Sequence, residues 1–390
     1  MTGQPSSTDP LRVLVVGAGV AGLEAALALR EMAGGLVSTT LLDPEREFAY
    51  LPMAVLEPFS RGCARRYSLA SIAADIGAEL VSDRFRWLDA DARVVHTRAG
   101  ETLGYDALLL ALGTRSRPRF RHARTLDSRH LDEQLHGLIQ DVQDGYVGRL
   151  AFLVPSPMPW PLPIYELALM TARRAREHGR DVSLMLATCE ESPLSIFGDA
   201  ASQAVERLLT GEGISTVTSA QCEVPEPGRV SVHVPQRPGQ ELTVNVESVV
   251  ALPQLFGPST PGLPKSAPDG FISVDEYARV LGLPDVFAAG DATDFAIKHG
   301  GIAAQQADVA ARSIASMAGA PVRPAKFEPW LSAVLLGGEK PLRLSARVTG
   351  GRGSSSEVSE VAGSGLPAKI GARYLAPYLG SLDRVSSGVA

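Results

Sequence analysis

The chain has 390 residues, of which 45% are hydrophobic and 21% are charged. This length suits two or three domains of roughly 100–200 residues each, and the composition excludes a largely disordered chain. The 37 Lys and Arg residues against 43 Asp and Glu residues give a formal net charge of −6, so no basic surplus points to nucleic acid. The three cysteines, Cys63, Cys189 and Cys222, are too few for a disulfide framework.

Residues 1–10 are polar and predict a loose tail without a signal peptide. No apolar run reaches the roughly 18 residues that a transmembrane helix needs. Together with a cysteine content that suits a reducing compartment, these features predict a cytoplasmic protein. Peripheral contact with the inner face of the membrane stays open.

The first part of the chain predicts a strand–helix–strand unit followed by a meander. Leu11–Val16 is a short apolar run typical of a buried strand, an Ala- and Leu-rich helix follows it, and Val37–Leu42 predicts the next strand. Residues 84–112 alternate around a glycine turn and end in an apolar strand. This order is typical of a dinucleotide-binding βαβ unit.

A second unit of the same layout follows a charged, helical connection at 116–148. Its predicted strands and helices lie at 149–154, 165–178, 182–186, 200–209, 214–217 and 247–252. A strand at 285–289 and a helix at 301–317 then predict a return to the first unit. Near the end, the Gly- and Ser-rich residues 350–365 predict a mobile loop, and residues 369–384 place apolar side chains near one helical face.

These patterns predict an α/β protein with two Rossmann-like three-layer domains and a C-terminal extension. The first domain would be made of two segments, with the second domain inserted between them. The predicted division is a tail at 1–10, cofactor-domain segments at 11–115 and 266–320, a second domain at 116–265 and a C-terminal interface region at 321–390.

A G-x-G-x-x-G motif lies between the first strand and the first helix. Its first glycine allows a tight turn, its second lets the backbone approach a pyrophosphate, and its third lets helix and strand pack closely. The N–H groups at the start of the helix can bind phosphate oxygens. Asp43, at the end of the next strand, stands where a carboxylate would accept ribose hydroxyls. The other candidate residues of this motif are Gly17, Gly19, Val20, Ala21 and Gly22.

Two later motifs follow apolar strands, Ala111-Leu112-Gly113-Thr114 and Gly290-Asp291. In order and separation, they and the glycine turn resemble the two-dinucleotide-binding-domain flavoproteins, which include the pyridine nucleotide–disulfide reductases. The resemblance covers residues 10–320. It implies that FAD is the cofactor, that Ala111, Gly113 and Thr114 lie beside it, and that Gly290 and Asp291 meet its ribityl or pyrophosphate part.

Two further segments narrow this resemblance, residues 48–52 (FAYLP) and residues 298–307 (KHGGIAAQQA). They are similar to the branch of sulfide:quinone reductases, flavocytochrome c sulfide dehydrogenases and type II NADH dehydrogenases. The likeness implies that Pro52 lies near the isoalloxazine ring. It also implies that a helix starting near Gly301, Ile302 and Ala303 points its N-terminus at the pyrimidine edge of the flavin, where reduced flavin carries negative charge.

Lys298 is the catalytic candidate, because the likeness places a cation near the flavin or the acceptor. The alternative is an ordinary solvated lysine at the surface. A histidine beside a glycine turn, as at His299, is no sign of covalently attached flavin.

The sequence departs from the family pattern in two places. It lacks the pair of redox cysteines that disulfide reductases and sulfide oxidisers use, so its thiols are expected to be ordinary ones. The second glycine motif of NADH-using relatives is replaced by residues 154–163, in which five prolines remove N–H donors. NAD(P)H is therefore a possible but atypical ligand. Glu166 matches the start of a helix in the family, and Glu190, just after a predicted strand, could accept ribose hydroxyls, but helix-dipole or surface acids are the alternative for both.

The predicted function is that of an FAD-dependent oxidoreductase. It would pass electrons from a small reduced donor through non-covalent FAD to a quinone or another small acceptor, without a redox-active cysteine pair. The alternatives are a flavoprotein component that serves a protein carrier, or an FAD-binding protein without catalysis. The apolar segments 327–336 and 370–382 could form a membrane-facing or homodimer surface, or pack against the cofactor domain.

Overall fold

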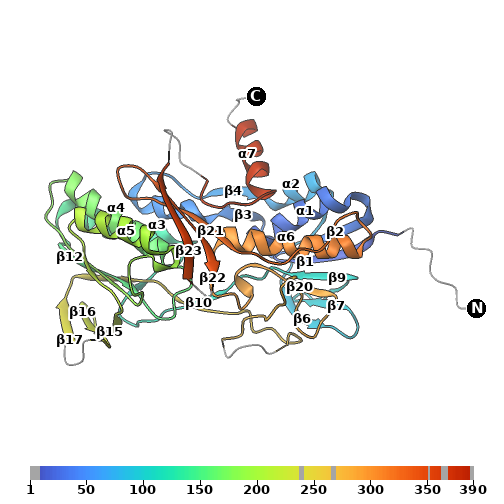
Figure 1. Ribbon diagram of the computed structural model, residues 1–390, viewed down its shortest axis with the longest axis horizontal. Helices are drawn as coiled ribbons and strands as arrows, with labels where there is room; N and C mark the ends of the chain where they lie inside the picture. The colour runs from blue at the N-terminus through green and yellow to red at the C-terminus, as the bar shows by residue number, and fades with distance from the viewer. Residues whose placement is uncertain (1–8, 237–240, 265–268, 350–351, 362–367, 387–390) are drawn as a thin grey trace, which may run out of the picture.

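The computed structural model describes residues 9–236, 241–264, 269–349, 352–361 and 368–386. Figure 1 shows two α/β units side by side, with a small antiparallel sheet between them and one short helix rising from the body. The predicted fold class is therefore confirmed. The predicted tail at 1–10 lies almost wholly outside the described residues.

The first unit is built on a parallel sheet with the strand order β20-β9-β1-β2-β5. Its central strands are apolar on both sides because both faces are covered. Val13 and Val15 pack against the helices α1 and α6, whereas Leu14 and Val16 pack against the meander β6–β8. The elements are β1 (Leu11–Val16), α1 (Val20–Ala33), β2 (Val37–Leu42), β5 (Glu79–Val81), β6 (Phe85–Asp89), β7 (Val94–Thr97), β8 (Thr102–Gly104), β9 (Ala107–Leu110), β20 (Val286–Ala288) and α6 (Gly300–Met317).

The second unit repeats this three-layer arrangement around a parallel sheet of order β11-β18-β12-β13-β14. Helices cover one face, and an antiparallel three-stranded sheet covers the other. The elements are β11 (Arg124–Thr125), α3 (Leu131–Asp144), β12 (Arg149–Val154), α4 (Leu162–Glu177), β13 (Ser183–Thr188), α5 (Asp199–Gly211), β14 (Ser215–Val217), β15 (Gln221–Glu226), β16 (Arg229–His233), β17 (Glu241–Asn245) and β18 (Ser248–Ala251).

The chain crosses between the units on two antiparallel strands, β10 (Arg115–Arg117) and β19 (Gln254–Phe256). The sequence predicted a helical connection over 116–148. Only α3 is helical there, so the prediction is correct for one part of the segment and wrong for the strands β10 and β11. The remaining elements of the first unit lie between β2 and β5 in the chain. They are β3 (Glu47–Tyr50), the 3₁₀ segment η2 (Leu51–Phe59), β4 (Arg65–Ser68) and α2 (Leu69–Ile76).

A C-terminal antiparallel sheet lies between the two units (Figure 1), and one sequence expectation fails here. Its strands are β21 (Trp330–Leu335), β22 (Leu342–Thr349) and β23 (Arg352–Glu360). The predicted loop at 350–365 is a strand over 352–360, because pairing with β22 holds a sequence of low intrinsic strand preference; residues 350–351 and 362–365 lie outside the described part. For residues 327–336 a membrane-facing or homodimer surface and packing within the chain were both open; the structure shows largely a core strand, with Leu331, Ala333 and Leu335 buried.

The last helix, α7 (Leu375–Ser386), starts later than predicted. Residues 369–374 precede it as an irregular strap, and Pro377 is tolerated because the first turn of a helix needs no N–H donors. Ile370, Leu375 and Leu379 are buried against the first unit, so packing against the cofactor domain accounts for much of this segment. Within the described residues, no helix is both long and apolar enough to cross a membrane.

Candidate functional site

The three glycine-containing motifs meet at the carboxyl ends of β1, β9 and β20. Gly17 has a φ of +101°, and a Cβ there would lie 2.3 Å from the carbonyl oxygen of Ala111. A Cβ on Gly22 would lie 1.8 Å from the oxygen of Gly17, whereas a Cβ on Gly19 would meet nothing within 4 Å. Two of these glycines are therefore needed for backbone packing, and Gly19 faces open space.

Asp43 lies beside this turn, as its position after β2 predicted. One carboxylate oxygen accepts a hydrogen bond of 2.6 Å from the N–H of Ala18, and the other accepts one of 2.8 Å from the N–H of Glu45. The side chain is only partly buried, and a carboxylate can accept about four hydrogen bonds. Asp43 therefore orders the turn and keeps capacity for a further donor.

Gly290 brings the N-terminal ends of α1 and α6 together. Its φ is +78°, and a Cβ there would lie 3.2 Å from the Cβ of Ala21 on α1 and 3.3 Å from the Cβ of Ala303 on α6. Its N–H donates to the side chain of Gln306, at 2.8 Å. The two helices run side by side over one face of the sheet (Figure 1). Two positive helix-dipole ends therefore point at the same region.

Asp291 directly follows Gly290, and Lys298 lies a few residues further on, just before α6. Burial raises the pKa of Asp291 to about 6, and Lys298 opposes this shift. Burial lowers the pKa of Lys298 to about 8. The Lys298 side chain is only 6% exposed, so the surface-lysine alternative is wrong; its ammonium donates to the carbonyls of Thr293 and Phe295.

The start of α6 is closed by residues from distant parts of the chain. The Nδ1 atom of His299 accepts from the N–H of Gly301, and burial lowers the pKa of His299 to about 4. A Cβ on Gly300 would lie 2.7 Å from the side chain of Ile370 in the strap. Ile302 and Ala303 are buried behind this end.

Sequence reasoning missed a buried ion pair beside this helix end. The Lys369 ammonium donates to both carboxylate oxygens of Glu166, at 2.6 and 2.7 Å, and the N–H of Leu336 donates to the same carboxylate. Glu166 is 1% exposed and Lys369 is 6% exposed, so Glu166 is no surface acid. The charge of Lys369 helps to lower the pKa of His299. The backbone N–H of Lys369 donates to the hydroxyl of Tyr50, which immediately precedes η2, where Pro52 lies.

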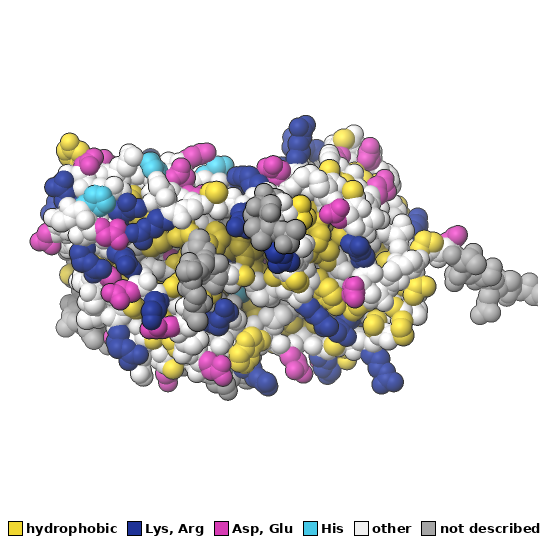
Figure 2. Space-filling model, turned by 90° about the horizontal axis from the view of Figure 1, so that it is seen from above, with side chains coloured by type: hydrophobic (Ala, Val, Ile, Leu, Met, Phe, Trp, Pro, Cys, Tyr) yellow, Lys and Arg dark blue, Asp and Glu magenta, His cyan; other side chains and the backbone are white. Residues whose placement is uncertain are grey.

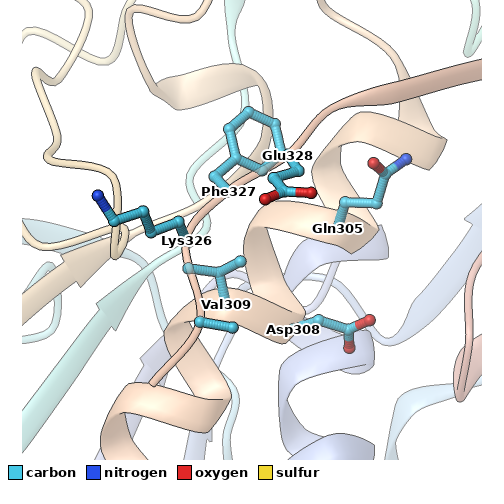
Figure 3. A pocket seen from close by; sticks show the side chains of 7 residues that line it. Gln305, Asp308, Val309, Lys326, Phe327 and Glu328 are labelled. Atoms are coloured by element: carbon cyan, nitrogen blue, oxygen red, sulfur yellow. The ribbon is translucent and has the colours of Figure 1, made fainter. Parts of the chain in front are cut away.

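A cavity of about 360 Å³ opens along α6 beyond this helix end, lined by Gln305, Asp308, Val309 and residues 325–328. In Figure 3 the side chains of Asp308 and Lys326 point in different directions around the opening. One Asp308 oxygen is buried and has no hydrogen-bond partner among the described residues. Burial and the neighbouring Glu24 raise the pKa of Asp308 to about 7, while Arg373 and Arg312 oppose the shift.

Replacing Asp308 by asparagine is expected to stabilise the protein at pH 8 but not at pH 5. The folded chain holds the Asp308 proton more tightly than the unfolded chain, so this contribution to stability is full below the ordinary pKa of 3.8 and is lost as the pH rises through about 7. For a partly solvated group we expect on the order of 1 kcal/mol, or roughly 2 °C in Tm at this chain length. Thermal unfolding of the wild type and the variant at both pH values measures this difference in stability. Equal gains at both pH values would contradict the assignment, and the exposed Asp91→Asn should show no difference.

The sequence profile of the pyridine nucleotide-disulphide oxidoreductases matches residues 11–143 and 166–310. The chain belongs to this family. It is therefore an oxidoreductase of the flavoprotein type, as the motifs predicted. An NADH dehydrogenase-like protein of Mycobacterium tuberculosis is 28% identical over 310 residues, which are 72% of each chain.

Solved structures with this fold superpose on most of the chain. The sulfide:quinone oxidoreductase of Aquifex aeolicus superposes with a TM-score of 0.78 at 19% identity, over 90% of this chain and 87% of that one. The covalent putidaredoxin reductase–putidaredoxin complex contains a chain with a TM-score of 0.61 at 19% identity, over 86% of this chain and 81% of that one. At these identities the likeness shows the shared fold alone.

Proposed function

We propose that the chain binds FAD non-covalently and uses it to carry electrons from a small reduced donor to a quinone or another small acceptor. The observation that carries the proposal is the meeting of the α1 and α6 N-termini at Gly290-Asp291. The N–H groups at the start of α1, which no side chain caps, suit a pyrophosphate. The positive dipole ends of both helices suit the pyrophosphate and a ring that becomes anionic. Bound FAD would supply the uptake and release of two electrons.

Three features of the described residues fit FAD. The open space at Gly19 and Gly113 leaves room for the pyrophosphate, and Asp43 can accept from ribose hydroxyls. Asp291 is a half-buried residue, and its carboxylate accepts no hydrogen bond from the described residues, so it is free to accept one from the ribityl chain. The proposed FAD-binding residues are Gly17, Gly19, Val20, Ala21, Gly22, Asp43, Pro52, Ala111, Gly113, Thr114, Gly290, Asp291, Gly301, Ile302 and Ala303.

The cationic side chains near α6 would stabilise negative charge at its N-terminal end. The hydrogen bonds of Lys298 are taken up by two backbone carbonyls, so we propose that it acts through its positive charge rather than by touching a substrate. The buried Lys369 ammonium adds a second charge near His299. The strap excludes water from this end, because Ile370 covers Gly300.

We propose that the three cysteines do not carry the electrons. Burial raises the pKa of Cys189 to about 11 and that of Cys222 to about 12, so both remain thiols at neutral pH and are poor nucleophiles. Cys63 is exposed, and all three are free. The proposed reaction therefore uses the cofactor without a redox-active cysteine pair.

Anaerobic reduction of the purified protein tests this function. The protein is expected to be yellow, to hold about one FAD per chain that acid releases, and to be bleached by one of the small donors sulfide, reduced quinone, NADH and NADPH. A soluble ubiquinone analogue should then restore the colour faster than dioxygen does. A colourless protein that FAD cannot reconstitute would refute the proposal, and a flavin that only dithionite reduces would favour a non-catalytic role.

A second candidate is a flavoprotein that passes electrons to a protein carrier. The basis for this candidate is that a chain of the same fold occurs in the solved covalent complex of putidaredoxin reductase with putidaredoxin. Slow quinone turnover together with a stably copurifying partner would support this candidate over the first.

We propose that contact with a membrane surface or a second subunit occurs on the face from which α7 rises. Figure 2 shows hydrophobic side chains across the middle of this face, with Lys and Arg side chains around them. Near the end of α7, Val385 is 81% exposed. Apolar groups flanked by cations suit a peripheral position at an anionic surface.

A further inference from the structure

We infer that Trp160 and the proline-rich loop at 155–163 close the second domain to NADH and NADPH, so that the donor of this protein is not a pyridine nucleotide. The inference deepens the proposed function, since it concerns which donor reaches the flavin. The family profile matches the chain on both sides of residues 144–165 and leaves this segment out. The segment contains the place where a second glycine motif would stand.

The loop lacks the donors that a pyrophosphate requires. A dinucleotide at the carboxyl edge of a parallel sheet binds to a glycine turn and to the N–H groups of the next helix. Here β12 is followed by prolines at alternate positions from 155 to 163, none of which has an N–H. In the first turn of α4, Pro163 has no donor, and the N–H of Ile164 donates to the oxygen of Pro161. The second domain therefore offers no phosphate cradle at this end.

Trp160 packs between a ring of the second domain and the residue at the start of α6. Its indole lies 4.3 Å from the imidazole of His299, centroid to centroid, and 6.0 Å from the ring of Phe197. The neighbouring carbonyl of Pro159 accepts a hydrogen bond from the N–H of Lys298. His299 is the residue that caps α6. The loop is thus packed onto the same helix end that we assign to the flavin, where a nicotinamide ring would have to enter.

Glu190, the acid at the usual ribose position, is also unavailable. It follows β13, but one carboxylate oxygen accepts from the hydroxyl of Tyr165 at 2.6 Å and from that of Thr188 at 2.9 Å. Its other oxygen, Oε1, is buried and has no hydrogen-bond partner among the described residues. A ribose hydroxyl could bind Oε2 only by displacing the hydroxyls of Tyr165 and Thr188, which is costly. Oε1 has no accessible surface at which a ribose hydroxyl could meet it. In our inference the second domain therefore offers no pyrophosphate site, no space for a nicotinamide ring and no accessible acceptor for the ribose hydroxyls.

Equilibrium binding to the FAD-loaded protein tests the inference without relying on turnover. Titration calorimetry with NADH, NADPH and ADP-ribose is expected to show no saturable binding up to about 1 mM. A dissociation constant of about 1 mM corresponds to a binding free energy of about 4 kcal/mol. Trp160→Ala should not create ADP-ribose binding, because the prolines remain. Saturable binding of any of the three to the wild-type protein would overturn the inference.

A hydride donor without a pyrophosphate group tests the role of Trp160 separately from that of the prolines. 1-Benzyl-1,4-dihydronicotinamide gives up a hydride and becomes the benzylnicotinamide cation. We expect Trp160→Ala to raise the rate at which it bleaches the flavin by roughly tenfold or more, because the ring can then approach its acceptor. Trp160→Phe, which keeps an aromatic ring, should resemble the wild type. Equal rates for Trp160→Ala and the wild type would overturn the role of Trp160.

Trp87 offers a matched control, because it also stacks on a histidine. Its ring lies 3.8 Å from that of His96, in the meander of the first unit. Trp87→Ala should leave the rate with the benzyl compound unchanged, and a similar rise in both alanine variants would overturn the inference by showing a general loosening. If the proposed function is wrong, the purified protein will contain no flavin. This outcome is seen before any of these donors is added, so it is distinct from failure of the inference.

Discussion

Replacing Gly19 by valine is expected to abolish FAD binding and leave the chain folded. The protein itself has room for the new side chain, since a Cβ on Gly19 meets nothing within 4 Å and the backbone there has a φ of −77°. The room lies at the N-terminus of α1, where we place the pyrophosphate. Loss of the glycine N-cap costs on the order of 1 kcal/mol, which a domain of this size tolerates.

The flavin-to-protein ratio of the purified variant measures this effect, with circular dichroism and Tm as checks of folding. We expect the ratio to fall at least about tenfold, equivalent to about 1.4 kcal/mol of affinity or more. Gly35→Val is a matched control, because Gly35 is exposed and its Cβ would also meet nothing. Gly22→Val should instead unfold the chain, because its Cβ would lie 1.8 Å from a backbone oxygen. A fully flavinated Gly19→Val protein would show that the cofactor is not bound at this turn.

Replacing Lys369 by methionine is expected to destabilise the protein by about 3–5 kcal/mol, the usual cost of leaving one member of a buried ion pair alone. Glu166 would keep its carboxylate in a site that is 1% exposed, with only the N–H of Leu336 as a donor. Burial already raises the pKa of Glu166, and Lys369 opposes that shift. Without the lysine the pKa rises further, so the variant should lose stability as the pH rises through this raised pKa.

Chemical unfolding of the holoenzyme measures the loss, and a double variant separates charge from packing. Glu166→Gln combined with Lys369→Met removes both charges and should recover most of the loss. Lys340→Met is the matched control, because Lys340 pairs with Glu360 at 2.7 Å while both side chains are over 60% exposed, and such a pair contributes at most about 1 kcal/mol. If Lys369→Met cost no more than Lys340→Met, the pair would not hold the strap in place.

The glycine turn, its flanking strands and the start of α6 could be predicted because each is determined by neighbouring residues. An apolar run buried on both faces indicates a central parallel strand, and the positive φ of Gly17 is a local requirement that glycine meets. The same reasoning predicted the two three-layer domains, since alternating strands and helices allow few arrangements. Asp43 followed from its place at the end of β2.

Contacts between distant segments were decided only by the tertiary structure. Glu166 and Lys369 are 203 residues apart, and nothing in either local sequence identifies the other as its partner. Likewise, the indole of Trp160 meets His299 from another domain, and a Gly- and Ser-rich segment becomes β23 because β22 pairs with it. The physical reason is common to all three: local sequence sets backbone preference and polarity, but burial and pairing depend on which surfaces the whole chain brings together.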